Sequence, residues 1–158
     1  MFERNLSFLK SRGQSLTELA LLLPLLVLIL LGTVDLARVY NSYVTLTNSA
    51  REGARYGATH PLNPSGATNT DAIRTRVIQE AANSGVALSS ENITVECISA
   101  AVDAHSGSST DCASPSVQLG DPIRVRVAYD FSFVTTYLFG VGTMSISNYA
   151  EMPIFAGK

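Results

Sequence analysis

An uncharged and almost wholly apolar run of sixteen residues, 19–34, constrains this chain more than any other feature. As a helix, the run would be about 24 Å long at 1.5 Å per residue. Extended back to Gln14 it has 21 residues, within the range of about 17–25 that a membrane-spanning helix needs. The extended segment contains one carboxylate, Glu18. Because a charge inside a bilayer is costly, Glu18 is a candidate for a functional role with a partner.

Two general interpretations of this segment are a cleaved secretory signal and a plain signal anchor. A signal peptide would explain the basic residues Arg4, Lys10 and Arg12, but no A-x-A cleavage site follows the run. Unless the run is a secretory signal that is removed, the positive-inside rule keeps the basic end in the cytoplasm and sends residues 35–158 across the membrane.

The residues just before the run favour a third interpretation. Gly13 follows a basic stretch and is separated by four residues from Glu18, which precedes the apolar run. This arrangement resembles a prepilin peptidase site and implies cleavage between Gly13 and Gln14. Glycine lets the backbone approach a protease closely. Glu18 could then pair with the new α-ammonium group, on the same chain or on a neighbour. Ser15 and Glu18 also fit a helix capping box, which is compatible with processing.

Residues 48–57 read NSAREGARYG. Six of them closely resemble the A-R-E-G-A-R motif of TadE-like proteins, the minor pseudopilins of tight-adherence (Tad/Flp, type IVc) pilus systems. These residues are Ala50, Arg51, Glu52, Gly53, Ala54 and Arg55. The resemblance runs without a gap from Arg12 to Gly57, and Leu19, where major Flp pilins carry tyrosine, favours a minor subunit. A TadG-like relative is the alternative assignment.

The resemblance implies a cytoplasmic-membrane protein that takes part in assembling a pilus for adhesion or secretion. Its implied partners are prepilin peptidase, other pilin or pseudopilin subunits, the inner-membrane assembly platform and the lipid bilayer. The expected parts are a cytoplasmic leader (1–13), a transmembrane half-helix (14–34), an amphipathic half-helix (35–57) and an extracytoplasmic head (58–158). The rival hypothesis is an unprocessed, membrane-anchored binding domain unrelated to pili.

Residues 35–57 continue the helix in an amphipathic pattern, so we expect one helix over about 14–56. The stripe expected to face the head consists of Leu36, Tyr40, Tyr43, Thr47, Ala50, Ala54 and Gly57. Arg51, Glu52 and Arg55 lie off this stripe. They could hold the following loop or an adjacent subunit, or form a solvated face with local ion pairs.

The fold class predicted for the whole chain is α+β and pilin-like, with one further helix and a small antiparallel sheet of about three strands. The second helix is expected over 71–83, capped by Thr70 or Asp71, and the strands over 92–99, 122–134 and 143–152. Alternation in the middle strand places Ile123, Val125, Val127, Tyr129, Phe131 and Phe133 on one face. Glu96 could pair with Arg124 or Arg126 on the other face. Sequential strands favour an antiparallel meander.

Cys97 and Cys112 lie on the side of the membrane expected to be exported, which favours a disulfide over two reduced cysteines. The closed loop of about 15 residues would add roughly 3 kcal/mol of stability in the chain-entropy model. The serine-rich segment 100–119 that contains Cys112 is expected to be a functional or flexible loop.

Catalytic and cofactor motifs are missing from the sequence. It has no G-x-S-x-G, P-loop, Rossmann glycine set or H-E-x-x-H. Two cysteines without a C-x-x-C make a poor zinc site, and neither His60 nor His105 has a neighbour that suggests a nucleophile–base pair. We therefore expect no enzyme, cofactor, metal or small-molecule substrate. The net charge of −2 argues against nucleic acid as a partner.

Overall fold

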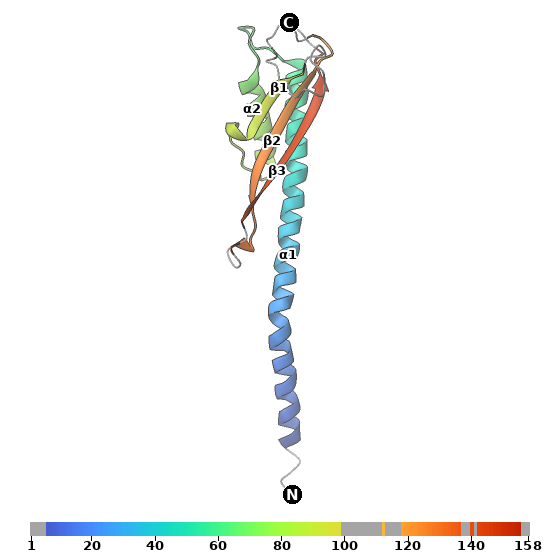
Figure 1. The fold of residues 1–158 in the computed structure, drawn as a ribbon, viewed down its shortest axis with the longest axis vertical. Coiled ribbons are helices and arrows are strands. Elements are labelled where there is room, and N and C mark those ends of the chain that lie inside the picture. Colours follow the sequence, from blue (N-terminus) through green and yellow to red (C-terminus); the bar gives the residue numbers. More distant parts are fainter. Residues whose placement is uncertain (1–5, 99–111, 113–117, 137–139, 141, 156–158) are drawn as a thin grey trace. The chain divides into compact units, whose positions relative to one another are not determined.

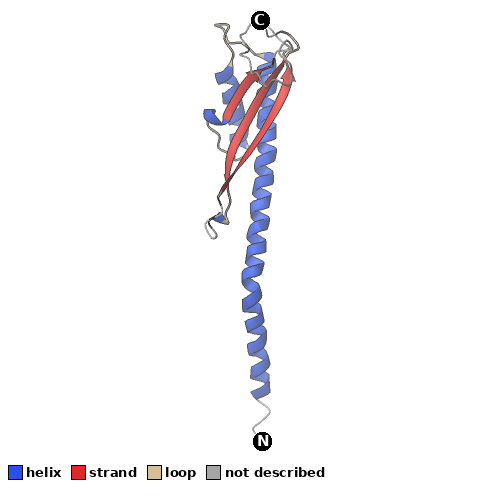
Figure 2. Cartoon of the chain, viewed as in Figure 1, coloured by secondary structure: helices blue, strands red, loops and turns tan. Residues whose placement is uncertain are grey.

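The computed structural model describes residues 6–98, 112, 118–136, 140 and 142–155, with side chains from Gln14 onward. The elements in chain order are α1 (Leu6–Thr59), α2 (Thr70–Asn83), the 3₁₀ turn η1 (Ser90–Asn92), β1 (Ile93–Cys97), β2 (Pro122–Ser132) and β3 (Thr143–Pro153). Figure 2 shows the helices and the strands of the sheet in different colours. The predicted fold class is confirmed: a long apolar N-terminal helix, one further helix and a three-stranded antiparallel sheet.

The chain forms two compact units. One contains residues 1–38 and 133–142, and the other contains residues 39–132 and 143–158. The second unit, which we call the head unit, therefore includes the last turns of α1 as well as α2 and the sheet.

Helix α1 begins at Leu6, eight residues before the start expected from the sequence. Residues 6–13 contain leucine, lysine and arginine, which favour a helix, and no proline, so the helix continues through Gly13 into the apolar run. Ser15 and Glu18 consequently lie inside the helix rather than at its start. The predicted capping box is therefore wrong for the full-length chain.

The sheet of the head unit has the strand order β1-β2-β3, and both pairs are antiparallel, which confirms the predicted meander. In the register, Ile93 of β1 lies opposite Val127 of β2, and Ile123 of β2 lies opposite Met152 of β3. The alternation predicted for β2 is confirmed at four of its six inward positions; Tyr129 is half-buried, and Phe133 lies beyond the end of the strand. Its buried residues are Ile123, Val125, Val127 and Phe131.

The core of the head unit lies between the inner face of the sheet, helix α2 and the last turns of α1 (Figure 1). Helix α2 contributes Ile73, Val77 and Ala81, the stripe expected for it. The side chain of Asn148 in β3 donates a hydrogen bond to the Thr47 hydroxyl of α1 at 2.5 Å. The side chains of α1 and the sheet are thus joined by polar as well as apolar contacts.

The stripe of α1 that packs on the head differs from the expected one. Tyr40 and Tyr43 are exposed, with 69% and 49% of their surface accessible, and Leu36 is exposed as well. The buried residues between 39 and 59 are Ser42, Thr45, Leu46, Ser49, Ala50, Gly53, Ala54, Gly57 and Ala58. Small residues allow close approach, and the buried Ser49 hydroxyl is satisfied by donating to the carbonyl of Thr45 at 2.8 Å. The small members of the expected stripe, Ala50, Ala54 and Gly57, are therefore buried as predicted, whereas its large members are not.

Two finer predictions are also corrected. The N-cap position of helix α2 is occupied by Asn69, and not by Thr70 or Asp71 as predicted. The Asn69 side chain makes no capping hydrogen bond. Glu96 lies opposite Arg124 in the register. However, the guanidinium of Arg124 binds the carboxylate of Glu151 in β3 at 2.6 Å. The cross-strand ion pair of Arg124 thus forms with β3 instead of β1.

Candidate functional site

The apolar half of α1 is the first part of the candidate site. Helix α1 is long enough and apolar enough to cross a membrane, judged by its length and composition. It is the one such helix among the described residues. Its leucine, isoleucine and valine side chains between residues 16 and 34 are mostly exposed. Exposed apolar surface of this extent is not stable in water, so the segment needs lipid or other apolar helices around it.

The predicted processing residues lie at the N-terminal end of this half. Gly13 is inside α1, so the bond predicted to be cut lies within a helix in the full-length chain. The amide of Gln14 donates to the carboxylate of Glu18 at 3.4 Å, one turn later on the same face. Because glycine costs about 1 kcal/mol relative to alanine in a helix, Gly13 is a position where the helix opens easily.

The A-R-E-G-A-R residues occupy two faces of α1 in the head unit. Ala50, Gly53 and Ala54 are buried, whereas Arg51 and Arg55 are exposed. This division shows that half of the motif is used for packing. The charged half points outward.

The outward half contains a local ion pair. The Arg55 guanidinium donates two hydrogen bonds to the Glu52 carboxylate, at 2.9 and 2.8 Å. These bonds, and the charges of Arg55 and Arg76, hold the pKa of Glu52 below its ordinary value despite partial burial. Arg76 of α2 also lies over the ring of Tyr56, 5.4 Å from its centroid. For Glu52 and Arg55, the structure favours the local ion pair over a contact with the following loop.

Gly53 and Gly57 let α1 approach both α2 and the sheet. A Cβ atom on Gly53 would overlap Cγ2 of Val77 in α2 and lie 3.3 Å from Cγ1 of Val125 in β2. A Cβ on Gly57 would lie 2.6 Å from Cδ1 of Ile123. The glycine of the motif is therefore required by the packing of the head.

Asp35 is a candidate site residue that the sequence reasoning missed. The residue is 4% accessible, and its carboxylate accepts hydrogen bonds from the backbone N–H groups of Val134 (2.7 Å) and Thr135 (3.0 Å). It also accepts one from the Thr135 hydroxyl at 2.9 Å. Its partners are about 100 residues away in sequence, so no local pattern indicates them. The one available signal is its position, as the first charge after the apolar run.

Asp35 also explains why β2 ends before Val134, the end expected from the sequence. The N–H groups of Val134 and Thr135 bond to the carboxylate instead of to a neighbouring strand. Burial alone would raise the pKa of Asp35, but these hydrogen bonds and the charge of Arg38 hold it below its ordinary value. The carboxylate is therefore charged at neutral pH.

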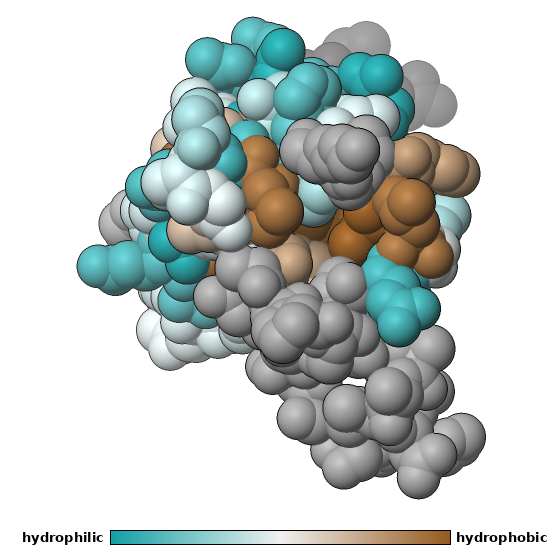
Figure 3. All heavy atoms as spheres, turned by 90° about the horizontal axis from the view of Figure 1, so that it is seen from above, coloured by the Kyte–Doolittle hydropathy of each residue, from teal (hydrophilic) through white to brown (hydrophobic). Residues whose placement is uncertain are grey.

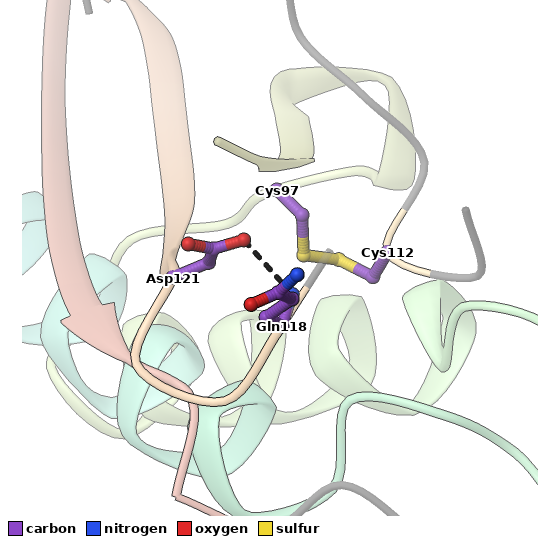
Figure 4. The surroundings of a disulfide bond; sticks show 4 residues. All are labelled: Cys97, Cys112, Gln118 and Asp121. Atoms are coloured by element: carbon purple, nitrogen blue, oxygen red, sulfur yellow. Dashed lines mark hydrogen bonds between the residues drawn. A yellow bond between two sulfur atoms is a disulfide. The ribbon is translucent and has the colours of Figure 1, made fainter. Parts of the chain in front are cut away.

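Cys97 and Cys112 form a disulfide, with their Cα atoms 5.0 Å apart (Figure 4). Cys97 is the last residue of β1, and both cysteines are buried. Nearby, the backbone N–H of Gln118 donates to the buried carboxylate of Asp121 at 2.9 Å. Most of the expected loop 100–119 and His105 lie outside the described residues.

We expect loss of this disulfide to destabilise the head without unfolding α1. The variant Cys97→Ser/Cys112→Ser should lose roughly 3 kcal/mol of unfolding free energy, because a loop of about 15 residues is no longer closed in the unfolded chain. Chemical denaturation of the protein in detergent, with and without reductant, measures the difference. Free-thiol labelling of both cysteines in the native protein without reductant would contradict the pairing.

The end of the head seen in Figure 3 carries mostly polar side chains, with apolar residues in small patches between them. Leu119 and Phe155 are large apolar residues with exposed side chains. Their neighbours in sequence are hydrogen-bonded, because the N–H of Gly120 donates to the carbonyl of Ile154. Among the described residues, no cluster of three or more His, Cys, Asp or Glu side chains could hold a metal ion.

Comparison with known proteins locates the family signal in the same part of the chain. The family model described as TadE-like protein matches residues 13–55, from the glycine of the predicted cleavage site to the last arginine of the motif. No curated protein and no solved structure matches the chain. Over residues 13–55, the chain is therefore similar to TadE-like proteins.

Proposed function

We propose that this chain is a minor pilin or pseudopilin that is cut by a prepilin peptidase and takes part in assembling a Tad-type pilus or related secretion filament. The observation that carries the proposal is the extent of the family match, which joins the apolar half of α1 to the motif packed in the head. The protein acts by assembly and not by catalysis. Its partners are other pilin subunits and the inner-membrane assembly platform.

The apolar half of α1 supports this proposal because it is exposed and uncharged from residue 19 to 34. Such a surface suits lipid before assembly and the apolar helices of other subunits afterwards. The buried small residues of 42–58 hold the head on the same helix. One helix then serves both as membrane anchor and as the support of an extracytoplasmic head.

Processing at Gly13 would place Glu18 in the first turn of the mature helix. Gln14 and Glu18 already share one face of α1, with a 3.4 Å hydrogen bond between their side chains. After cleavage, the α-ammonium of Gln14 and the positive end of the helix dipole would both lie near this carboxylate. The charge pair would lower the cost of holding Glu18 in an apolar environment, on its own chain or against a neighbouring subunit.

N-terminal sequencing of the protein purified from membranes tests the proposal. We expect a mature chain that begins at Gln14 in cells that contain the peptidase, and at Met1 in cells that lack it. An intact Met1 in the presence of an active peptidase would favour the alternative, an unprocessed membrane-anchored binding domain. The absence of the protein from sheared pilus fractions and assembly complexes would count against an assembly role.

A further inference from the structure

The connection between β2 and β3 is attached to the anchor helix. Residues 133–142 group with residues 1–38, whereas the two strands belong to the head unit. The first four residues of the connection, 133–136, form a turn in which the N–H of Thr136 donates to the carbonyl of Phe133 at 3.2 Å. Asp35 binds the middle of this turn through three hydrogen bonds. We call residues 133–136 the Asp35-bound turn.

Asp35 lies where the spanning segment ends. The 21 residues from Gln14 through Val34 make a helix of about 31 Å, which matches a hydrocarbon core of about 30 Å. Asp35 is the first charge after the apolar run, and the guanidinium of Arg38 lies 3.5 Å from its carboxylate with 45% of the Arg38 side chain accessible. An arginine at this level can reach lipid phosphates. In the membrane-anchored chain of the proposed function, the turn bound to Asp35 would therefore lie at the outer surface of the bilayer.

The composition of the connection fits a membrane surface better than water. No Asp, Glu, Lys or Arg occurs between Asp130 and Glu151. Phe133 and Val134 are only half-buried in the turn. Connections that run through water are usually rich in polar and charged residues. Aromatic residues, in contrast, are enriched where a membrane protein passes through the headgroup region.

We propose that the Asp35-bound turn is a second membrane contact, which inserts Phe133 and Val134 into the headgroup region of the outer leaflet beside the anchor helix. This contact would give the chain two attachments to the bilayer. The bound partner is the lipid surface itself, and Asp35 positions the turn against it. The inference rests on the membrane anchoring in the proposed function.

Tryptophan fluorescence can test this contact because the chain contains no tryptophan. The full-length protein carrying Phe133→Trp would be reconstituted in vesicles of phosphatidylcholine and phosphatidylglycerol. Brominated lipids, with bromine near either the headgroup end or the methyl end of the acyl chain, would quench the fluorescence according to depth. We expect a blue-shifted emission for Phe133→Trp and stronger quenching by the shallow bromine than by the deep one.

Two further single-tryptophan variants separate this inference from the proposed function. Leu25→Trp, in the middle of the span, should be quenched most by the deep bromine, whereas Leu119→Trp, on an exposed head residue, should not be quenched. If Leu25→Trp is quenched and Phe133→Trp behaves like Leu119→Trp, the membrane anchor stands and this inference is overturned. If Leu25→Trp is not quenched, the anchor fails and this inference fails with it.

Asp35→Ala tests whether the carboxylate positions the turn. In the Phe133→Trp background it should reduce shallow quenching and shift the emission to the red, while Leu25→Trp with the same substitution should be unaffected. Val134→Trp is a second probe in case Phe133→Trp disturbs the turn, and circular dichroism checks that the helix content is unchanged. Unaltered quenching at both turn positions in Asp35→Ala would overturn the assigned role of Asp35.

Discussion

Gly13→Ala accumulates as the full-length, 158-residue protein in membranes that contain an active prepilin peptidase; this is the result we expect. The methyl group would stand next to the bond that is cut, where close approach of an enzyme needs a bare backbone. Alanine also favours the helix by about 1 kcal/mol over glycine, and Gly13 lies inside α1. Both effects oppose opening and cleavage of the helix at this bond.

Gly32→Ala is the matched control for this experiment. Gly32 lies in the same helix, and a Cβ atom on it would meet no atom of the described residues within 4 Å. Gly32→Ala therefore adds the same methyl group and the same helix preference away from the predicted cleavage bond. Intact-mass measurement should find it shortened by residues 1–13, like the native chain. Equal processing of Gly13→Ala and the native chain would contradict the role assigned to Gly13.

The sequence predicts the elements of this fold well because each has a strong local signal. The apolar run indicates a helix by its length, and alternation from Ile123 to Phe131 correctly divides β2 into a buried and a solvated face. The residues at which strands end are harder to predict, because they depend on side chains that are distant in sequence. Strand β2 stops at Ser132, and Asp35 takes the N–H groups of Val134 and Thr135, a competition between residues about 100 positions apart.

The packed face of α1 could not be read from apolar periodicity for a related reason. Large side chains such as Tyr40 and Tyr43 suggest a core, but close packing of α1 on α2 and the sheet excludes them and buries Ser49 and Gly53, which lie outside the expected stripe. The small residues of the A-R-E-G-A-R motif mark the face of α1 that is buried. Weighting small residues as packing positions would have identified the buried face.

Gly53→Leu should therefore prevent the head from packing on α1. The first added carbon already overlaps Cγ2 of Val77, a β-branched side chain whose χ1 is fixed in a helix and which cannot turn away. Overpacking by even a few methylenes costs about 1–3 kcal/mol, and occasionally more. The total free energy of unfolding of a small domain is only about 5–15 kcal/mol. Thermal unfolding of the protein in detergent, followed by near-ultraviolet circular dichroism, should show a large loss of head stability.

A graded series identifies steric overlap as the cause. Gly53→Ala should destabilise the head less than Gly53→Leu, because it adds one carbon instead of four. In both variants, a gain in helix preference of up to about 1 kcal/mol offsets part of the overlap. Gly57→Ala should cost less again, since its new methyl group meets Cδ1 of Ile123 and of Ile73, the flexible ends of two side chains. Gly32→Ala, with open space around it, should leave head unfolding unchanged. Stabilisation of the head by Gly53→Ala, by the full gain in helix preference, would contradict this explanation. Glycine at this position would then not be required by the close approach of α1 to α2 and β2.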